Sequence, residues 1–466
     1  MPEPDAYDPD VLTVLDPADG SVVGRLDCAS TAEVETAVET AAKAAVDWAR
    51  TAPGERAARV ADAAARIEVA AADLALLTTR EMGKPLDDAR GGVDAGVGTL
   101  RQYAELGPLH RGRSLQGGWD ATDLMVPQPR GVVAAITPWN DPVAVPCGLL
   151  GAALVTGSTV VFKPSERTPH TGVELARLMA EVLPAGVLQV LVGDGRTGAA
   201  LAASPQVDLV AHVGSTATGR AIAEAAARTG AKVILENGGN DPLIVDAGVD
   251  PVWAAEQAAL GAFANAGQIC TSVERVYVVE AVADAFLDAL VERAEGLTVG
   301  PGTEPSTDLG PLVDERMRRT VHEQVEGAVA DGARLLAGGA VPEGPGTFYP
   351  ATVLTDCTDA MTVMREETFG PVAPVRVVPD FATALTAAAA GPYGLAAVVL
   401  TADMAHAQRA WRELPVGTVK INAAFGGAPG GAAQPRGASG SGFGYGPELL
   451  DEMTTTKVVH VGTPRV

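Results

Sequence analysis

The sequence contains no long apolar segment and no cluster of basic residues. No run free of charged or turn-forming residues approaches the roughly 20 residues that a membrane-spanning helix needs. The start M-P-E-P-D-A-Y-D-P-D lacks the basic region and apolar centre of a secretion signal. The formal net charge is −24, and no run of Lys and Arg reverses it locally, which disfavours binding to a phosphate backbone. We therefore expect no membrane partner, no nucleic-acid partner and a cytoplasmic location.

Cysteine and histidine are also scarce. The four cysteines, Cys28, Cys147, Cys270 and Cys357, lie far apart and form no C-x-x-C pair. The six histidines show no spacing that is typical of metal ligands. The sequence thus predicts neither a disulfide framework nor a metal site. A chain of 466 residues, of which 47% are hydrophobic and 20% charged, has the balance of a folded globular protein with two or three domains.

From residue 131 the sequence alternates short β-type runs with helix-like segments. We expect strands at 131–137, 158–163, 187–193, 207–214 and 231–236, with helices at 142–154 and 217–229. Upstream, Ala, Val and Leu recur at three- and four-residue spacing over 31–80, which predicts helices that pack on the sheet. This alternation predicts an α/β fold with a doubly wound parallel sheet, whose ligands bind at the carboxyl ends of the strands.

A second α/β segment follows a predicted turn at 237–242. We expect helices near 252–264, 282–296 and 314–332, and strands at 274–280, 396–401 and 417–421. Nine of the 21 residues from 426 to 446 are Gly, which predicts a long loop with little intrinsic structure, either a simple connection or a lid. The final run at 454–462 alternates like an exposed strand and would need a partner strand.

Cys270 is the candidate nucleophile. It follows the small, turn-like run A-N-A-G-Q, whereas Cys147 lies in an apolar helical stretch and is interpreted as core, and the other two cysteines as structural or incidental. A free thiol has a pKa near 8.5, so a nucleophile at pH 7 needs about 1.5 units of depression. Glu236 follows the apolar run V-I-L and is a candidate base, because burial raises the pKa of a carboxyl group. A strand-end Glu held in a salt bridge is the alternative.

Four segments together resemble the NAD(P)-dependent aldehyde dehydrogenase superfamily over nearly the whole chain. They are P-W-N (138–140), F-K-P-S-E (162–166), I-L-E-N-G-G-N (234–240) and F-A-N-A-G-Q-I-C-T-S (263–272), in the order and at roughly the separations of that family. The resemblance implies an aldehyde-dehydrogenase-like α/β fold with a Rossmann-type coenzyme domain, an α/β catalytic domain and a small β oligomerisation extension. It also implies that Cys270 attacks the aldehyde, that Asn140 and the Cys270 N–H hold the oxyanion, and that Glu236 activates the hydrolytic water.

The same resemblance implies a division of the chain. We expect a coenzyme-binding domain at 1–110 and 130–238, a catalytic domain at 239–438, an oligomerisation segment at 111–129 and 453–466, and a return to the coenzyme domain at 439–452. In the family the terminal strand pairs with another subunit. We therefore expect a homodimer or homotetramer.

The coenzyme signals lie mainly at strand ends. The run H-V-G-S-T-A-T-G (212–219) follows a predicted strand and opens a helix, which would place a phosphate against N–H groups and the positive helix end. Without the resemblance, a plain βα turn would explain it as well. The resemblance implies contacts to NAD, or alternatively NADP, from Ile136, Trp139, Lys163, Ser165, Glu166, Gly214, Ser215, Gly219, Glu367 and Phe369. Since Glu166 would accept a bond from the ribose hydroxyl and repel a 2′-phosphate, we expect NAD to be preferred.

The substrate positions depart from the family. By the resemblance, a small-molecule aldehyde would meet Asp141, Val145, Gly148, Ile269, Thr271 and Gly427. Four of these, Asp141, Val145, Gly148 and Gly427, stand where well-known members carry bulky residues, which predicts a wider and more polar tunnel unless bulky residues elsewhere refill it. Asp141 favours a cationic or hydroxylated tail, whereas Arg436 in the Gly-rich run favours a carboxylate.

Two further observations concern the reaction class. The usual L-E-L-G-G-K appears here as L-E-N-G-G-N, with Asn237 and Asn240 changed. An enzyme that passes its thioester to coenzyme A is an alternative, but Glu236 favours water as the acceptor. A non-redox cysteine hydrolase would need a His base, and no His stands in a recognisable Cys–His context. A non-catalytic role on the same fold is the remaining alternative.

Overall fold

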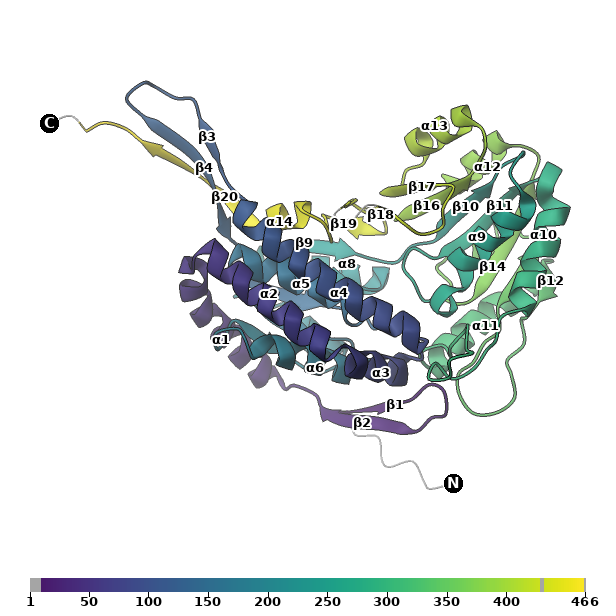
Figure 1. Cartoon of the computed structure of the whole chain (residues 1–466), viewed down its shortest axis with the longest axis horizontal. Helices are drawn as coiled ribbons and strands as arrows, with labels where there is room; N and C mark the ends of the chain where they lie inside the picture. Colours follow the sequence, from purple (N-terminus) through teal and green to yellow (C-terminus); the bar gives the residue numbers. More distant parts are fainter. Residues whose placement is uncertain (1–9, 428–430, 465–466) are drawn as a thin grey trace.

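A computed structural model describes residues 10–427 and 431–464 of the chain (Figure 1). The first large sheet has the order β19-β9-β8-β5-β6-β7. Its strands are β5 (Val132–Ile136), β6 (Thr159–Lys163), β7 (Leu188–Val190), β8 (Leu209–Val213), β9 (Lys232–Glu236) and β19 (Gly440–Ser441). All pairs are parallel except β19 with β9. The strand order reverses between β5 and β8, which is the point where ligands bind in doubly wound sheets.

Helices cover both faces of this sheet. They are α1 (Thr31–Arg50), α2 (Pro53–Val69), α3 (Ala71–Met82), α4 (Leu86–Leu106), α5 (Ala144–Thr156), α6 (Pro169–Ala180), α7 (Gly195–Ala202) and α8 (Thr216–Thr229). Val133, Ala135 and Phe162 enter the core formed with α2 to α6, while Val132, Ala134 and Val161 enter the core under α1, α7 and α8. Neighbouring strand residues thus point to opposite, equally apolar faces, which explains the nearly continuous apolar runs in the sequence.

The second large sheet has the order β12-β13-β14-β11-β10-β16-β17. Its elements are β10 (Asp241–Val245), β11 (Val273–Val279), β12 (Arg334–Ala337), β13 (Thr352–Thr355), β14 (Val372–Val378), β16 (Ala396–Leu400) and β17 (Thr418–Ile421), with α9 (Pro251–Phe263), α10 (Glu280–Glu295), α11 (Glu315–Ala330), α12 (Phe381–Ala388) and α13 (Met404–Glu413). Its core is separate from those of the first sheet. The turn predicted at 237–242 extends two residues too far. Asp241 and Pro242 already belong to strand β10 and pair with β11.

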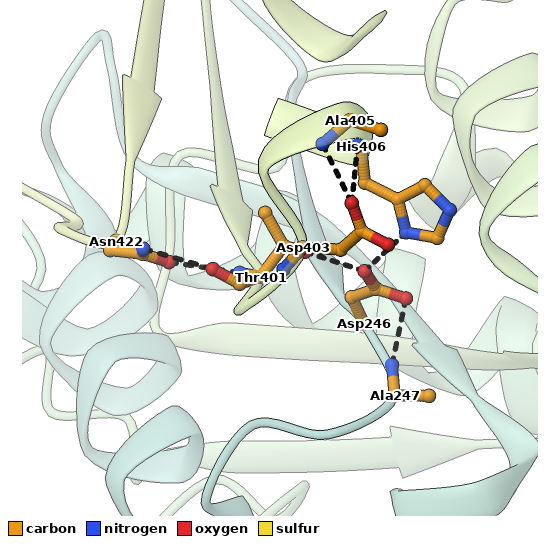
Figure 2. A network of polar contacts seen from close by, with 7 residues as sticks. All are labelled: Asp246, Ala247, Thr401, Asp403, Ala405, His406 and Asn422. Atoms are coloured by element: carbon orange, nitrogen blue, oxygen red, sulfur yellow. Dashed lines mark hydrogen bonds and ion pairs between the residues drawn. The ribbon is translucent and has the colours of Figure 1, made fainter. Parts of the chain in front are cut away.

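A polar network around the buried residues Asp246 and Thr401 lies at the carboxyl ends of β10, β16 and β17 (Figure 2). Asp246 is only 2% exposed; it accepts a hydrogen bond from the Thr401 hydroxyl (2.6 Å) and lies 2.6 Å from Nδ1 of His406. Asn422 exchanges two hydrogen bonds with the Thr401 backbone (2.8 and 3.0 Å), and Asp403 caps the first turn of α13. These contacts therefore join α13 to the sheet. The sequence patterns did not indicate them.

A three-stranded sheet extends away from the rest of the chain (Figure 1). It contains β3 (Arg113–Leu115), β4 (Thr122–Pro129) and β20 (Thr454–Val461), and β20 pairs antiparallel with β4 from Thr454↔Pro129 to Val461↔Thr122. The terminal strand thus finds its first partner within its own chain, not in another subunit as the sequence led us to expect. Its other edge has no partner strand in the part of the chain that the structure describes.

The Gly-rich run is more ordered than predicted. Residues 428–430 of the predicted loop 426–446 lie outside the described residues. Further on, β18 (Arg436–Gly437) pairs with β15 (Tyr393–Gly394), and β19 pairs with β9. The prediction of little structure was wrong for this part, because the edge of β9 supplies backbone partners that a local pattern cannot reveal.

The remaining elements are short. They are β1 (Val11–Leu15), β2 (Val22–Asp27), α14 (Glu448–Glu452) and the 3₁₀ turns η1 (Gly107–Leu109), η2 (Ala264–Gly267) and η3 (Thr362–Met364). Over residues 10–427 and 431–464, no helix combines the length and the apolar character needed to cross a membrane. The cytoplasmic location stays a prediction of the sequence.

Candidate active site

Cys270 lies in a bend between η2 and the start of β11. The bend forms because Asn265, Ala266 and Gly267 all have positive φ, at 50°, 53° and 72°. Such a left-handed run of two non-Gly residues is strained and persists where the surroundings enforce it. Enforcement comes from the Gln268 carbonyl, which accepts hydrogen bonds from Nδ2 of Asn140 (3.0 Å) and Nδ2 of Asn265 (3.2 Å). The predicted oxyanion residue is thus bonded to the turn that carries the predicted nucleophile.

The surroundings of the thiol are unfavourable to a thiolate. Burial, with a further contribution from Glu236, Asp241 and Glu367, raises the pKa of Cys270 to about 12. The backbone N–H of Thr271 lowers this pKa but does not offset the rise. Loss of hydration is the largest cause of the shift, and the three acidic side chains add to it.

Glu236 ends strand β9 and points toward the return segment of the chain. Its Oε1 accepts a hydrogen bond from the backbone N–H of Gly444 (3.0 Å). Burial raises the pKa of Glu236 to about 7, and the Gly444 N–H opposes that rise. The direction agrees with the shift expected for a base at the end of an apolar strand.

The turn after Glu236 is hydrogen-bonded to a second carboxyl group, that of Glu367. Oε1 of Glu367 accepts a hydrogen bond from the Gly239 N–H (2.9 Å), and burial raises the pKa of Glu367 to about 7. Asn237 donates to the Ala438 carbonyl (3.1 Å), and Asn240 donates to the Glu366 carbonyl (3.2 Å). The two asparagines that differ from the family pattern therefore stabilise the turn through their own amides.

Two aromatic rings meet beside this turn. The rings of Trp139 and Phe369 are edge-to-face at 5.5 Å, and the Arg167 guanidinium lies 5.2 Å from the centre of the Trp139 ring. Phe369 has a positive φ of 52°, and its N–H donates to Glu274 (2.9 Å). Residues 139 and 369, which the sequence assigned to one coenzyme site, are therefore brought together although they are far apart in the chain.

The crevice between β5 and β8 has the features of a dinucleotide site. Ile136 at the end of β5 lies opposite His212 at the end of β8. Ser215 caps α8, whose N-terminus points its free N–H groups into this edge. A Cβ on Gly214 would lie 2.7 Å from the His212 ring, and one on Gly219 would lie 2.1 Å from Oδ1 of Asn237. Both positions accept only Gly, so the backbone stays open to a phosphate, and the residues present fit a dinucleotide.

Lys163 and Glu166 lie together at the end of β6. The Lys163 ammonium is buried, donates to the Pro164 carbonyl (3.0 Å) and lies 3.6 Å from Oε2 of Glu166. Burial lowers the pKa of Lys163, while the Glu166 side chain is 48% exposed. Ser165 is buried beside them and accepts from the Arg167 N–H (3.3 Å). The structure thus groups these predicted ribose ligands, with the carboxylate on the open side.

The sequence analysis missed His212. Its ring is 4% exposed, and neither ring nitrogen has a hydrogen-bond partner among the described residues. Burial lowers its pKa to about 4, so the imidazole is neutral at physiological pH. Its position at the end of a central strand was the available signal, because doubly wound sheets bind ligands there.

The predicted substrate positions are only partly open. Oδ2 of Asp141 lies 3.9 Å from the ammonium of Lys84, a residue of the loop before α4 that the sequence analysis did not identify. A Cβ on Gly148 would lie 3.7 Å from the Tyr445 ring, and the Tyr445 hydroxyl is hydrogen-bonded to Thr99 (2.8 Å). A bulky residue from elsewhere therefore refills the space at Gly148, which is the alternative that the sequence left open.

The other substrate positions lie around the thiol or at the surface. Val145, Ile269 and Thr271 are half-buried, and Gly427 is exposed with a φ of 137°. Arg436 is exposed and belongs to β18. Over the described ranges, no three His, Cys, Asp or Glu side chains are grouped so that they could hold a metal ion.

Comparison with known proteins identifies the family. The profile of the aldehyde dehydrogenase family matches residues 5–459, nearly the whole chain. The chain belongs to the aldehyde dehydrogenase family. It is 38% identical to a betaine aldehyde dehydrogenase from Cereibacter sphaeroides over 97% of this chain and 94% of that one. It is 36% identical to a glutarate-semialdehyde dehydrogenase from Pseudomonas putida, over 90% and 87% of the two chains.

Solved structures agree with this assignment. A betaine aldehyde dehydrogenase from Staphylococcus aureus in complex with NAD⁺ superposes with a TM-score of 0.95 at 30% identity, over 98% of this chain and 92% of that one. The predicted aldehyde dehydrogenase fold is therefore confirmed, as is the reaction class: this family member is an NAD(P)-dependent oxidoreductase that acts on an aldehyde.

Proposed function

We propose that this aldehyde dehydrogenase oxidises its substrate through a covalent intermediate on Cys270. The observation that carries the proposal is that Asn140, Glu236 and Cys270 lie in one region. Asn140 donates a hydrogen bond to the turn before Cys270, and the charge of Glu236 raises the pKa of the Cys270 thiol. The sulfur adds to the aldehyde carbon, and the carbonyl oxygen becomes an oxyanion. The second N–H of the Asn140 amide and the Cys270 N–H stabilise that charge.

The coenzyme site follows from the crevice at the β5–β8 switch point. Gly214, Ser215 and Gly219 would accommodate the pyrophosphate, Lys163 and Glu166 the adenosine ribose, and Glu367 and Phe369 the nicotinamide end; Ile136, Trp139 and Ser165 line the same region. When bound, the oxidised nicotinamide accepts the hydride and its positive charge favours the thiolate. Because the pKa of Cys270 is raised in the chain alone, a nearby cation would favour the reactive thiolate.

Glu236 then activates water. A carboxyl group with a pKa of about 7 is roughly half ionised at neutral pH, which suits a general base. Loss of the hydride lets the oxyanion close to the carbonyl of a thioester on Cys270. Glu236 takes a proton from water as the oxygen attacks the thioester carbon and the C–S bond breaks. The carboxylic acid leaves, and the proton held by Glu236 returns to the departing sulfur. Transfer of the thioester to coenzyme A is the alternative outcome, and the buried base disfavours it.

A panel of aldehydes tests this function. Reduced nicotinamide should accumulate without coenzyme A, and its rate should not depend on added coenzyme A. An absolute requirement for coenzyme A would show that the enzyme is acylating, and hydrolysis without coenzyme reduction would show a hydrolase.

The substrate is proposed to be a polar or bulky aldehyde. The Lys84–Asp141 pair offers both signs of charge beside the tunnel, and the Tyr445 and Thr99 hydroxyls add polar groups next to Gly148. The similar proteins are named for aldehydes with a cationic or an anionic tail, so a charged tail is consistent with either half of the pair. Amino-, hydroxy- and carboxy-aldehydes should exceed acetaldehyde and propanal in kcat/KM; the reverse order would contradict a polar tunnel.

We further propose NAD as the preferred coenzyme and a homodimer or homotetramer as the assembly. Glu166 supports the first, because a carboxylate at the ribose hydroxyl repels a 2′-phosphate. The free edge of β20 supports the second, since an unpaired strand edge presents N–H and C=O groups to a neighbouring chain.

We also propose the division into coenzyme, catalytic and oligomerisation segments that the sequence predicts. The separate cores of the two large sheets support that division.

A further inference from the structure

We propose that Gly444 is a positioning residue for Glu236. Its backbone N–H and its lack of a side chain together hold the Glu236 carboxylate beside the nucleophile. The inference rests on the proposed role of Glu236 as the base, and it concerns how this chain holds that base.

The contact leaves no room for a side chain at position 444. The Gly444 N–H donates to Oε1 of Glu236 at 3.0 Å. A Cβ added at Gly444 would lie 2.3 Å from Cγ and 2.5 Å from Oε1 of Glu236, closer than real Cβ contacts occur. Gly444 is not among the residues with positive φ, so backbone conformation does not require Gly there. The requirement is space for the Glu236 side chain.

The backbone at Gly444 is fixed from both directions. Upstream, β19 pairs with β9 in a register that sets Gly440 opposite Glu236. Downstream, the Tyr445 hydroxyl is hydrogen-bonded to Thr99 of α4 (2.8 Å). Because both anchors are in place, a clash at position 444 would be relieved by movement of the Glu236 side chain and not of the backbone.

The Glu236 carboxylate interacts with the Cys270 thiol and with the Gly444 N–H. Glu236 has the largest effect of any charge on the pKa of Cys270, yet no hydrogen bond joins the two side chains among the described residues. The Gly444 N–H also stabilises the ionised form of Glu236. Gly444 therefore holds the base near the nucleophile without a direct hydrogen bond between the two, and it favours the ionised form of the base.

The test is Gly444→Ala, with Gly98→Ala as the matched control. Gly98 is exposed on α4, and a Cβ there meets no atom within 4 Å. In Gly444→Ala we expect a full burst of one reduced coenzyme per active site. The following steady-state rate should fall about tenfold or more, and the acid limb of its pH profile should move to higher pH. Gly98→Ala should match the parent in burst, rate and pH profile.

A double substitution separates positioning from general damage. If Gly444 acts through Glu236, adding Gly444→Ala to Glu236→Gln should change the steady-state rate no further. An equal further loss in that background would overturn the proposal, as would a parental rate and pH profile in Gly444→Ala alone. If Gly444→Ala does not fold, Gly444→Ala with Glu236→Ala should fold, because the clash is removed; failure of that pair to fold would also overturn the proposal.

The outcome also distinguishes this inference from the proposed function. A parental steady-state rate in Glu236→Gln would refute the role of Glu236 as the base, and with it the basis of this inference. A burst followed by a slow rate in Glu236→Gln, together with parental behaviour of Gly444→Ala, would refute only the positioning role.

Discussion

At the scale of single residues, the environment of a side chain decides its role more than its type. Cys147 is buried and Cys270 is half-buried, and both thiols have raised pKa values. Cys147 packs in the apolar helix α5, whereas Cys270 follows a strained turn and faces a carboxyl base. Glu236 and Glu367 are likewise strand-end or loop carboxyls whose pKa is raised to about 7 by burial. The candidate catalytic residues Cys270 and Glu236 are therefore among those whose pKa is raised by burial.

The ionisation of Glu236 predicts a pH dependence of turnover. Its carboxylate is the reactive form, and its pKa is raised to about 7, so turnover should fall as the pH falls through 7. At pH 6 the steady-state rate should be about one-tenth of its alkaline plateau if deacylation limits turnover. Steady-state kcat measured from pH 5.5 to 9 checks this, and a flat profile below pH 7 would show that the base is ionised throughout.

The exposed carboxylate of Glu166 predicts coenzyme choice. In Glu166→Gln the repulsion of the 2′-phosphate is lost while the Lys163 ammonium remains, so the preference for NAD over NADP should narrow by roughly tenfold. The ratio of kcat/KM for the two coenzymes, measured in the parent and the variant, is the readout. A parent enzyme that favours NADP would refute this assignment.

At the scale of elements, the strands of the first sheet and several helices could be predicted because their apolar spacing is strong, but the 21-residue helix α4 and the strand β14 were not recognised. The predicted helices at 31–80 appear as α1 to α3, and the strands of the first sheet end within two residues of their predicted limits except at β7, where the predicted run is longer than Leu188–Val190. Strand β10 was not recognised, since Asp241 and Pro242 resemble turn residues.

The missed features depend on tertiary contacts. The two-residue strand β19 exists only because β9 offers it an edge, and Gly444 and Tyr445 reach the active site only through that pairing. Lys84 carries no local pattern that distinguishes it from an ordinary loop residue, and the only signal for His212 is its position at the end of a central strand. The candidate catalytic residues could thus be proposed from motifs, whereas neighbours that reach them only through tertiary contacts, such as Gly444, could not.

The Asp246 network predicts the stability of the second sheet. Asp246→Ala would leave the Thr401 hydroxyl and the Ala247 N–H without their carboxylate, at a cost of about 3 kcal/mol in the free energy of unfolding. Asp380→Ala, which removes an exposed helix cap on α12, should cost less. Urea unfolding of both variants checks the difference, and equal small losses would show that the network contributes little.

At the scale of the whole molecule, the projecting sheet predicts assembly. Deletion from Thr454 onward removes β20, exposes the edge of β4 and takes away the free edge available to another subunit. The truncated protein should be an inactive monomer or an aggregate by light scattering and size-exclusion chromatography. A stable and active monomer would contradict the assembly proposed here.

The same scale shows why the acidic chain can still bind an anionic coenzyme. The net charge of −24 disfavours polyanions in general. In the crevice, however, Gly-rich backbone, the N-terminus of α8 and the buried Lys163 ammonium supply local positive potential. These groups would favour an anionic coenzyme in the crevice despite the negative net charge of the chain.

The most direct test of the account is rapid-mixing kinetics of Glu236→Gln with NAD and a reactive aldehyde. The account predicts a burst of one reduced coenzyme per active site, because Cys270 still forms the thioester, followed by a steady rate at least about a hundredfold below that of the parent. Cys270→Ala should give neither burst nor turnover while it still binds NAD. A Glu236→Gln enzyme with the parental steady rate, or a Cys270→Ala enzyme that still reduces NAD, would contradict the mechanism.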